Sequence, residues 1–401
     1  MKAYKVRIYP NKNQEILINK TFGCTRFIFN QMLSERSDVY EELKDDKRKL
    51  YEYKYKTEKQ YKDEFSFMKE VDSISLQQAR VDLDTAFKNF FQSRSGKRRG
   101  KKVGFPKWRS KKENRKSYRT QNVHNNIFID FNKKQIKLPK LGLVSYTDDR
   151  LFYAVIKNVT IEKTPTGKYF ASICVEESID TSIHQVSSES KAVGLDYDSK
   201  NLFTNNENQV AGYPRFFRKY EKRLAKEQRR KDRRQKGSKR REKQRVRVAK
   251  IHEKIALSRK DFHHKLSTHI VKNYDIIGVE TLNMQAMSQC LNLGKSTMDN
   301  AWGMFVNMLE YKCEWYGKHL VFADKFYAST KTCSNCGYKN IALTLKDRDW
   351  DCPVCHIHHN RDQNAGINLM NNAVKNTVGH TEIYARGDIV NLYFSEESIC
   401  Q

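Results

Sequence analysis

The chain has 401 residues and carries 76 Lys and Arg against 47 Asp and Glu, a formal net charge of +29 that favours a polyanionic partner, most commonly nucleic acid. Its 38% hydrophobic and 11% aromatic residues exclude a compositionally disordered protein, and its length allows more than one domain. Because no apolar run approaches the ~18 residues of a membrane span and the opening residues lack the apolar stretch of a signal peptide, we expect a cytoplasmic, nucleoid-associated prokaryotic protein without a membrane partner.

The first part of the chain is mostly helical in pattern after an opening strand. Alternating apolar residues predict the strand, and apolar residues at helical spacing predict the helices. In chain order we expect a strand at 2–9, a helix at 13–33, an exposed helix or hairpin at 38–69 and an amphipathic helix at 76–91. The polar side of the last helix carries Gln77, Gln78 and Lys88.

A basic loop and a β-rich region follow. The loop at 96–119 contains Trp108 and Tyr118, which could stack on a nucleobase or equally anchor the loop in the core. Short β-like runs between 126 and 177, separated by turn residues, predict a small β-barrel. The serine-rich stretch 180–191 is expected to link this region to the second half.

The second half alternates between strands and helices. We expect a strand at 192–196, a long basic helical segment at 215–250, a further helix at 251–273, a strand at 275–280, a helix at 301–317, a strand near 320–322, a short helix at 364–372 and an irregular tail beyond about 375. The basic segment holds 19 Lys and Arg against four acids. A solvated face would usually carry more acids for i,i+4 pairing, so we interpret it as a surface for a phosphate backbone.

Four of the nine cysteines form two Cys-x2-Cys pairs separated by fifteen residues: Cys333 and Cys336, then Cys352 and Cys355. Each pair offers two thiolates, and four thiolates fill the tetrahedral shell of a structural zinc. A redox dithiol is the alternative, but two matched pairs fit a metal better. Three histidines lie beside the second pair: His356, His358 and His359. Because the cysteines already complete the shell, we expect these histidines to face solvent or nucleic acid.

Three acidic residues stand in positions that suggest a second metal site. Asp196 and Glu280 each end a short apolar strand, where a charge is costly unless it binds a cation or a partner. Asp362 precedes the short helix, and three acids brought together would favour divalent ions as the neutralising partner. Each acid alone is more often a turn or cap residue, and the pattern alone does not select these three from 47.

Together, these motifs resemble the TnpB family, the RNA-guided nucleases of insertion-sequence transposons, which are related to compact type V CRISPR effectors. The resemblance covers almost the full length. It includes residues 5–10, 22–30, 76–78, 86–91, 104–106, 194–197, 278–282, both cysteine pairs and 360–365. His356 and Asn360 stand where the family often has Gly and Asp, and neither change removes a metal ligand or a catalytic acid.

The resemblance implies an α/β and β multidomain fold. The expected parts are a β-barrel wedge domain (1–10 and 120–185), a helical recognition domain (11–119), a RuvC-like nuclease domain of RNase H fold (190–328 and 359–375), an inserted zinc ribbon (329–358) and a flexible tail (376–401). It implies Asp196, Glu280 and Asp362 as catalytic acids that hold two magnesium ions, with one structural zinc on the four cysteines.

The resemblance also implies the partners and the reaction. One protein would bind one transposon-encoded guide RNA and cut double-stranded target DNA next to a short target-adjacent motif. We expect nucleic-acid contacts from Gln77, Gln78, Lys88, Arg229, Arg230, Arg233 and Arg234, since side-chain amides can contact adenine and arginines can contact phosphate. The alternatives are a catalytically silent RNA-guided DNA-binding repressor and a DNA transposase, and the retained acids favour the active nuclease.

Overall fold

The computed structural model describes residues 1–98, 100–112, 116–177, 186–187, 189–290, 294–344 and 346–378. The chain divides into two compact units, residues 1–178 and residues 179–401. Across the described ranges, no helix combines the length and the apolar character that crossing a membrane requires. The tail expected beyond 375 is helical as far as Val378, and the rest of it lies outside the described residues.

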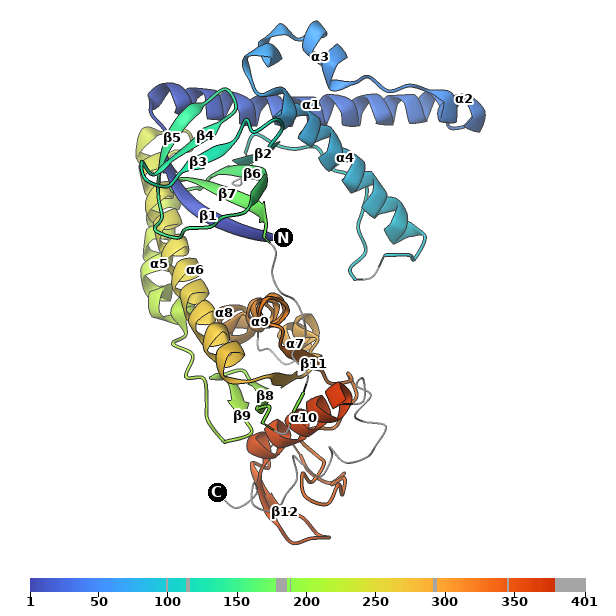
Figure 1. Ribbon diagram of the computed structural model, residues 1–401, viewed down its shortest axis with the longest axis vertical. Helices are drawn as coiled ribbons and strands as arrows, with labels where there is room; N and C mark the ends of the chain where they lie inside the picture. The colour runs from blue at the N-terminus through green and yellow to red at the C-terminus, as the bar shows by residue number, and fades with distance from the viewer. Residues whose placement is uncertain are drawn as a thin grey trace. The chain divides into compact units, whose positions relative to one another are not determined.

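The first unit contains an antiparallel sheet of seven strands in the order β2-β6-β7-β1-β5-β4-β3 (Figure 1). The strands are β1 (Lys2–Tyr9), β2 (Lys116–Gln121), β3 (Phe128–Asp130), β4 (Gln135–Leu138), β5 (Gly142–Thr147), β6 (Val155–Lys163) and β7 (Tyr169–Glu176). The predicted opening strand is confirmed, and it pairs with β7 on one side and β5 on the other. Alternate residues such as Val6 and Ile8 are buried in the core of this sheet.

The helices of the first unit are α1 (Lys12–Leu43), α2 (Lys47–Glu52), α3 (Glu58–Glu64), the 3-10 helix η1 (Ser66–Glu70) and α4 (Ser73–Arg94). Helix α1 begins with a capping box, in which Asn11 and Gln14 each accept the other's backbone N–H at 2.9 Å. The predicted amphipathic helix is confirmed as α4. Its cap, Asp72, accepts from Ser75 N and from Thr120 Oγ1, so the start of α4 is tied to strand β2.

The second unit contains a four-stranded sheet in the order β11-β10-β8-β9. Its strands are β8 (Ala192–Asp198), β9 (Leu202–Asn205), β10 (Ile276–Val279) and β11 (His319–Phe322), and β10 runs parallel to both β8 and β11. Val193, Leu195, Ile277 and Val279 point to one face, where they pack against Phe305 and other apolar residues of the helices. The alternate positions therefore point to the opposite face.

Helix α10 (Arg361–Val378) lies across that opposite face of the sheet (Figure 1). Two glycines make this close approach feasible. A Cβ at Gly194 would lie 1.9 Å from the carbonyl oxygen of Gly366, and one at Gly278 would lie 2.3 Å from the carbonyl oxygen of Leu369. The backbone of α10 therefore rests directly on β8 and β10, and this contact fixes the distance between the helix and the two strands.

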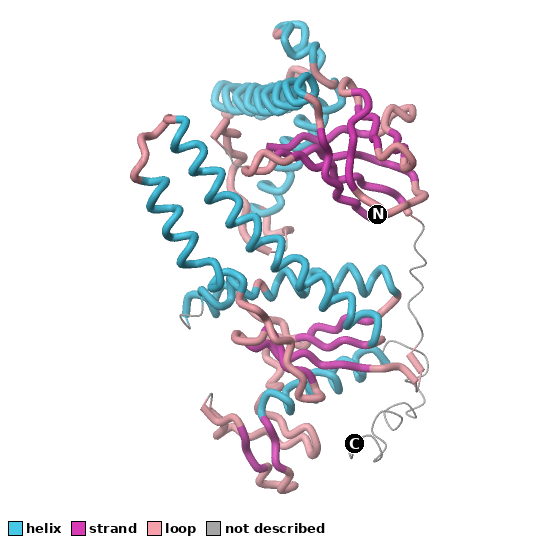
Figure 2. The backbone as a smooth tube through the Cα atoms, turned by 90° about the vertical axis from the view of Figure 1, so that its left-hand side faces the viewer, coloured by secondary structure: helices cyan, strands magenta, loops and turns pink. Residues whose placement is uncertain are grey.

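The basic segment forms two helices whose boundary differs from the predicted one. The structure has α5 (Phe216–Asp232) and α6 (Lys239–Asn273), which lie side by side as the two long helices of Figure 2. The chain turns at Gly237, whose φ is +88°, and Ser238 caps α6 by accepting from Arg241 N. The predicted boundary at 250 is wrong because the basic composition ends there, whereas the apolar face that packs α6 on α5 continues through Ile251 and Ile255.

The remaining helices of the second unit are α7 (Met284–Cys290), α8 (Gly294–Asn300) and α9 (Trp302–Tyr316). Helix α9 confirms the helix predicted at 301–317, whereas α7 and α8 were not predicted from the sequence. The buried Asp299 at the end of α8 accepts from Phe217 N at 2.8 Å, so α8 supplies a cap for α5 that α5 does not provide itself.

Candidate functional site

Three elements of the second unit bring the predicted acids to one face of its sheet. Asp196 is in β8, Glu280 directly follows β10, and Asp362 is in the first turn of α10. Asp196 shares a face with Gly194, and Glu280 with Gly278, because side chains alternate along a strand. Leu195 is paired with Val279, so Asp196 and Glu280 occupy corresponding positions on neighbouring strands. Helix α10 covers this same face and carries Asp362.

The acids influence one another electrostatically. Asp196 is buried, and burial together with the negative charges of Glu280 and Asp362 raises its pKa well above the usual range of an aspartic acid. Burial also raises the pKa of Glu280, while a hydrogen bond from Ser329 Oγ to Glu280 Oε1 (2.7 Å) opposes that shift. A site that disfavours its own negative charge would be stabilised by a bound cation, and carboxylate oxygens suit hard divalent ions.

Two arginines hold the third acid. Arg348 Nη1 lies 2.7 Å from Asp362 Oδ2, and Arg361 Nη2 lies 3.2 Å from Asp362 Oδ1. Arg361 also opposes the raised pKa of Asp196. Neither arginine was predicted as a site residue: Arg361 lies within the 360–365 motif, whereas nothing in the local pattern separates Arg348 from the other basic residues of the chain.

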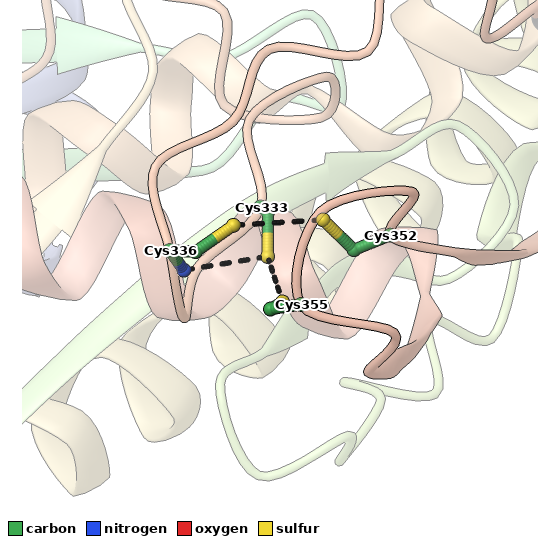
Figure 3. A group of neighbouring side chains, drawn as sticks. All are labelled: Cys333, Cys336, Cys352 and Cys355. Atoms are coloured by element: carbon green, nitrogen blue, oxygen red, sulfur yellow. Dashed lines mark hydrogen bonds between the residues drawn. The ribbon is translucent and has the colours of Figure 1, made fainter.

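The four cysteines converge on one point (Figure 3). The Sγ atoms of Cys333, Cys336, Cys352 and Cys355 all lie within 4.8 Å of one another. The Sγ atoms of Cys333 and Cys355 are 3.6 Å apart, and those of Cys336 and Cys352 are 3.5 Å apart. Tetrahedral zinc with bonds of about 2.3 Å requires sulfur separations of roughly 3.8 Å, so the cluster fits a structural zinc ion.

The two cysteine turns have the same backbone form. Gly337 N donates to Cys333 O at 3.0 Å, and His356 N donates to Cys352 O at 2.8 Å. Gly337 has φ +76° and His356 has φ +60°, both in the left-handed region. Glycine adopts this region freely, whereas a side chain there costs about 1–2 kcal/mol. His356 therefore occupies a position where glycine would be less strained.

The prediction that His359 faces solvent or nucleic acid is wrong. Strands β12 (Asp349–Asp351) and β13 (His358–Asn360) form a small antiparallel pair beside the cysteines. Within β13, His358 is exposed and His359 is buried, as strand alternation requires. The Nε2 atom of His359 lies 3.0 Å from Cys333 Sγ, and its ring packs 4.8 Å from the ring of Trp350. His359 therefore contacts the cysteine cluster without joining it.

Removal of one thiolate should release the zinc. We expect Cys352→Ser to reduce bound zinc from one ion per chain to near zero, since structural zinc in small domains contributes on the order of 10 kcal/mol to folding. Zinc measured by mass spectrometry and the near-ultraviolet circular dichroism around Trp350 would report the loss. The control is Cys174→Ser in β7, which should keep its zinc. Full zinc occupancy in Cys352→Ser would contradict the assignment.

The predicted nucleic-acid residues differ in their surroundings. On α4, Gln77 and Lys88 are exposed, whereas Gln78 is buried and its Oε1 has no hydrogen-bond partner among the described residues. On α5, Arg229 is exposed, and Arg230 pairs with Glu227 at 2.7 Å. After α5, Arg233 is exposed and Arg234 donates to Arg240 O at 2.6 Å. In the basic loop, Trp108 is exposed, whereas Tyr118 lies in β2 and is buried against Phe22.

The first unit also contains a basic cavity that the sequence analysis missed. Its volume is about 360 Å³, and its lining includes five cationic residues and one acid: Arg26, Arg109, Lys111, Lys116, Arg119 and Asp82. Asp82 pairs with Arg109 at 3.1 Å and with Arg119 at 3.5 Å. Four of these cations lie within the predicted basic loop at 96–119, whereas Arg26 comes from α1 and Asp82 from α4, so the sequence indicated the charge but not the cavity. The excess of cations suits a phosphate group.

Three family models match the chain. One is described as "Probable transposase" and covers residues 172–291, one as "Cas12f1-like, TNB domain" and covers 302–369, and one as "Helix-turn-helix domain" and covers 1–45. In the structure, the last of these ranges forms β1, one long helix and the turn that follows it.

Two of the relatives match more than nine tenths of the chain. A protein of Streptomyces pristinaespiralis named "Putative RNA-guided DNA endonuclease" is 32% identical over 92% of this chain and 88% of its own length. A protein of Escherichia coli K12 named "Putative RNA-guided DNA endonuclease InsQ" is 29% identical over 97% of this chain and 95% of its own length. Among solved structures, a cryo-EM structure of a Cas12f1–sgRNA–target DNA complex matches with a TM-score of 0.55 at 13% identity, covering 89% of this chain and 83% of that one. The match shows a shared mixed α/β fold.

Proposed function

This chain belongs to the TnpB family, and we propose that it is an RNA-guided DNA endonuclease whose hydrolytic site is formed by Asp196, Glu280 and Asp362. The observation that carries the proposal is the convergence of these acids, from two neighbouring strands and one covering helix, on one face of a sheet. A structural role would not require a buried aspartate beside two further acids, because such a cluster opposes folding unless a cation neutralises it.

The donor set of the site fits magnesium. Asp196, Glu280 and Asp362 would hold two ions, and these ions would supply the activation of water and the stabilisation of the leaving oxygen that phosphodiester hydrolysis requires. The chain's own residues have separate tasks. Ser329 donates to Glu280 and holds its carboxylate, and Arg348 and Arg361 place positive charge beside Asp362, where a DNA phosphate could pair with them.

We propose the following domain assignment. The second unit's sheet and α10 would be a RuvC-like nuclease domain of RNase H fold (190–328 and 359–375), with the four-cysteine zinc ribbon (329–358) inserted between Glu280 and Asp362. In the first unit, the β-barrel wedge domain predicted at 1–10 and 120–185 would contain the seven-stranded sheet, whose strand β2 begins slightly earlier, at Lys116. Helices α1 to α4 would belong to the recognition domain (11–119).

Guide RNA and double-stranded target DNA are the proposed nucleic-acid partners, with one protein per RNA. The basic helices α5 and α6 would contact phosphates, and the exposed Arg229 and Arg233 suit this role. Gln77 is exposed on α4 and could contact a base of the target-adjacent motif. Sequencing of copurifying RNA tests the proposal: we expect one dominant RNA from the transposon that encodes the protein. Integration products formed without RNA would instead identify a transposase.

The magnesium requirement should depend on pH. The pKa of Asp196 is raised, so protons compete with the cation for this carboxylate until the pH exceeds the raised value. The magnesium concentration for half-maximal cleavage should therefore fall as pH rises, by up to about tenfold per pH unit for each proton displaced. Magnesium titrations of cleavage from pH 6 to 8.5 would measure this. A requirement independent of pH would show that proton displacement from these acids does not accompany metal binding.

A further inference from the structure

The segment Tyr327–Ser334, which leads from β11 to the first cysteine pair, is fastened along helix α10 by two buried asparagines. Asn368 Nδ2 donates to Ser329 O at 2.7 Å and to Thr332 O at 2.6 Å. Asn364 Nδ2 donates to Thr332 O at 2.8 Å, and Asn364 Oδ1 accepts from Ser334 N at 2.9 Å. Asn364 is 1% exposed and Asn368 is 4% exposed.

The two asparagines stand one helical turn apart and share a face of α10. Toward the zinc end, Asn364 holds the amide of Ser334, the residue after the ligand Cys333. At the other end of the segment, near Glu280, the side chain of Asn368 donates to the carbonyl oxygen of Ser329. Burial of an amide side chain is costly unless its polar atoms are hydrogen-bonded, and here both Nδ2 groups and the Oδ1 of Asn364 bond to this one segment.

Ser329 connects the fastened segment to the acid site. Its hydroxyl donates to Glu280 Oε1 at 2.7 Å, and the residue is buried. A hydrogen bond to one carboxylate oxygen restricts rotation of the carboxylate, which leaves the other oxygen with a defined direction. Because Asn368 holds the backbone of Ser329, the orientation of Glu280 depends on α10, the same helix that carries Asp362.

We propose that Ser329 is a positioning residue for Glu280, and that Asn368 and Asn364 form a bridge that holds Ser329 and the first zinc knuckle on α10. The bridge gives Glu280 and Asp362 one common support, and it ties the zinc ribbon to that support. The inference rests on the proposed metal site of the three acids and adds the residues that set its geometry.

Binding of Mn²⁺ to the full-length, zinc-loaded protein, followed by electron paramagnetic resonance, tests the proposal without relying on cleavage. We expect Ser329→Ala to keep one zinc per chain and to weaken Mn²⁺ binding by roughly 10- to 100-fold, as loss of a residue that orients a metal ligand typically does. Ser329→Thr retains the hydroxyl and should bind Mn²⁺ within about threefold of the unmodified protein.

The bridge itself is tested by Asn368→Leu, which removes both donors at similar volume. We expect it to weaken Mn²⁺ binding as Ser329→Ala does, and the double variant to lose little more than either single variant, because both act through one contact. The matched control is Asn376→Leu. Asn376 is an exposed amide of the same helix, and among the described residues its side chain hydrogen-bonds to Asn372, also in α10. It should leave Mn²⁺ binding unchanged.

Unchanged Mn²⁺ binding in Ser329→Ala would overturn the positioning role, even if Asn368→Leu failed to fold. Losses that add fully in the double variant would overturn the bridge. Failure of the proposed function looks different: Asp196→Asn would then bind Mn²⁺ as well as the unmodified protein does, which would show that the three acids hold no metal.

Discussion

Asp196→Asn is expected to reduce cleavage of a guide-matched DNA by roughly three orders of magnitude or more, while RNA and DNA binding stay within a few fold. The substitution keeps the shape of a buried side chain that lies beside Glu280 and Asp362 and removes its charge. Without that charge the site loses a cation ligand, and metal-assisted hydrolysis loses several kcal/mol of transition-state stabilisation. Single-turnover cleavage and a band-shift assay measure the two effects separately.

The matched control for this variant is Asp198→Asn, two residues further along β8. Asp198 accepts from Lys200 N and from Asn201 Nδ2, each at 2.8 Å, which is the pattern of a turn residue. Its cleavage rate should stay within a few fold of the unmodified protein. If Asp198→Asn lost activity and Asp196→Asn kept it, the assignment of the acids would be wrong.

Among alanine substitutions of the described glycines of the second unit, Gly194→Ala should cause the largest loss of stability. Its Cβ would lie 1.9 Å from Gly366 O and 2.5 Å from Met370 N, both backbone atoms of α10. Backbone cannot rotate out of the way, so α10 must move off the sheet, and the cost should reach or exceed the ~3 kcal/mol at the upper end of ordinary overpacking. Because α10 carries Asp362, cleavage should fall as well. Urea unfolding and the cleavage rate would both report the change.

Gly303→Ala in α9 is the control for Gly194→Ala. Among the described residues, no atom other than those of its chain neighbours and of the adjacent helix backbone lies within 4 Å of a Cβ at Gly303, which is exposed in α9. Alanine should therefore be neutral or raise the unfolding free energy by up to about 1 kcal/mol. Equal stability losses in the two variants would show that contact between α10 and β8 is not the cause.

Several features of the fold followed from local sequence patterns. The opening strand, the helix at 76–91 and the strand that contains Asp196 were predicted because apolar periodicity is read directly from neighbouring residues. The two cysteine pairs were equally direct, since their spacing defines a metal site before any fold is known. Convergence of the four sulfur atoms agrees with that prediction.

Other features depend on contacts between distant segments. The break between α5 and α6 follows the packing of Leu224 on Val248 and the residues beyond it, which composition does not reveal. His359 differs from His358 only in the side of a three-residue strand on which it lies. The prediction that Asp196, Glu280 and Asp362 form one site required the family resemblance. Successive acids are 84 and 82 residues apart along the chain, and they come together through strand pairing and the packing of α10 on the sheet.

RNA-guided cleavage is tested most directly with the purified protein, its copurified guide RNA and magnesium, on two linear duplexes that share the target-adjacent motif. One duplex matches the guide and the other carries the same bases in scrambled order. We predict that only the matched duplex is cut. A matched duplex that is bound and stays intact would contradict the account and indicate a silent RNA-guided repressor, and equal cutting of both duplexes would contradict guidance by RNA.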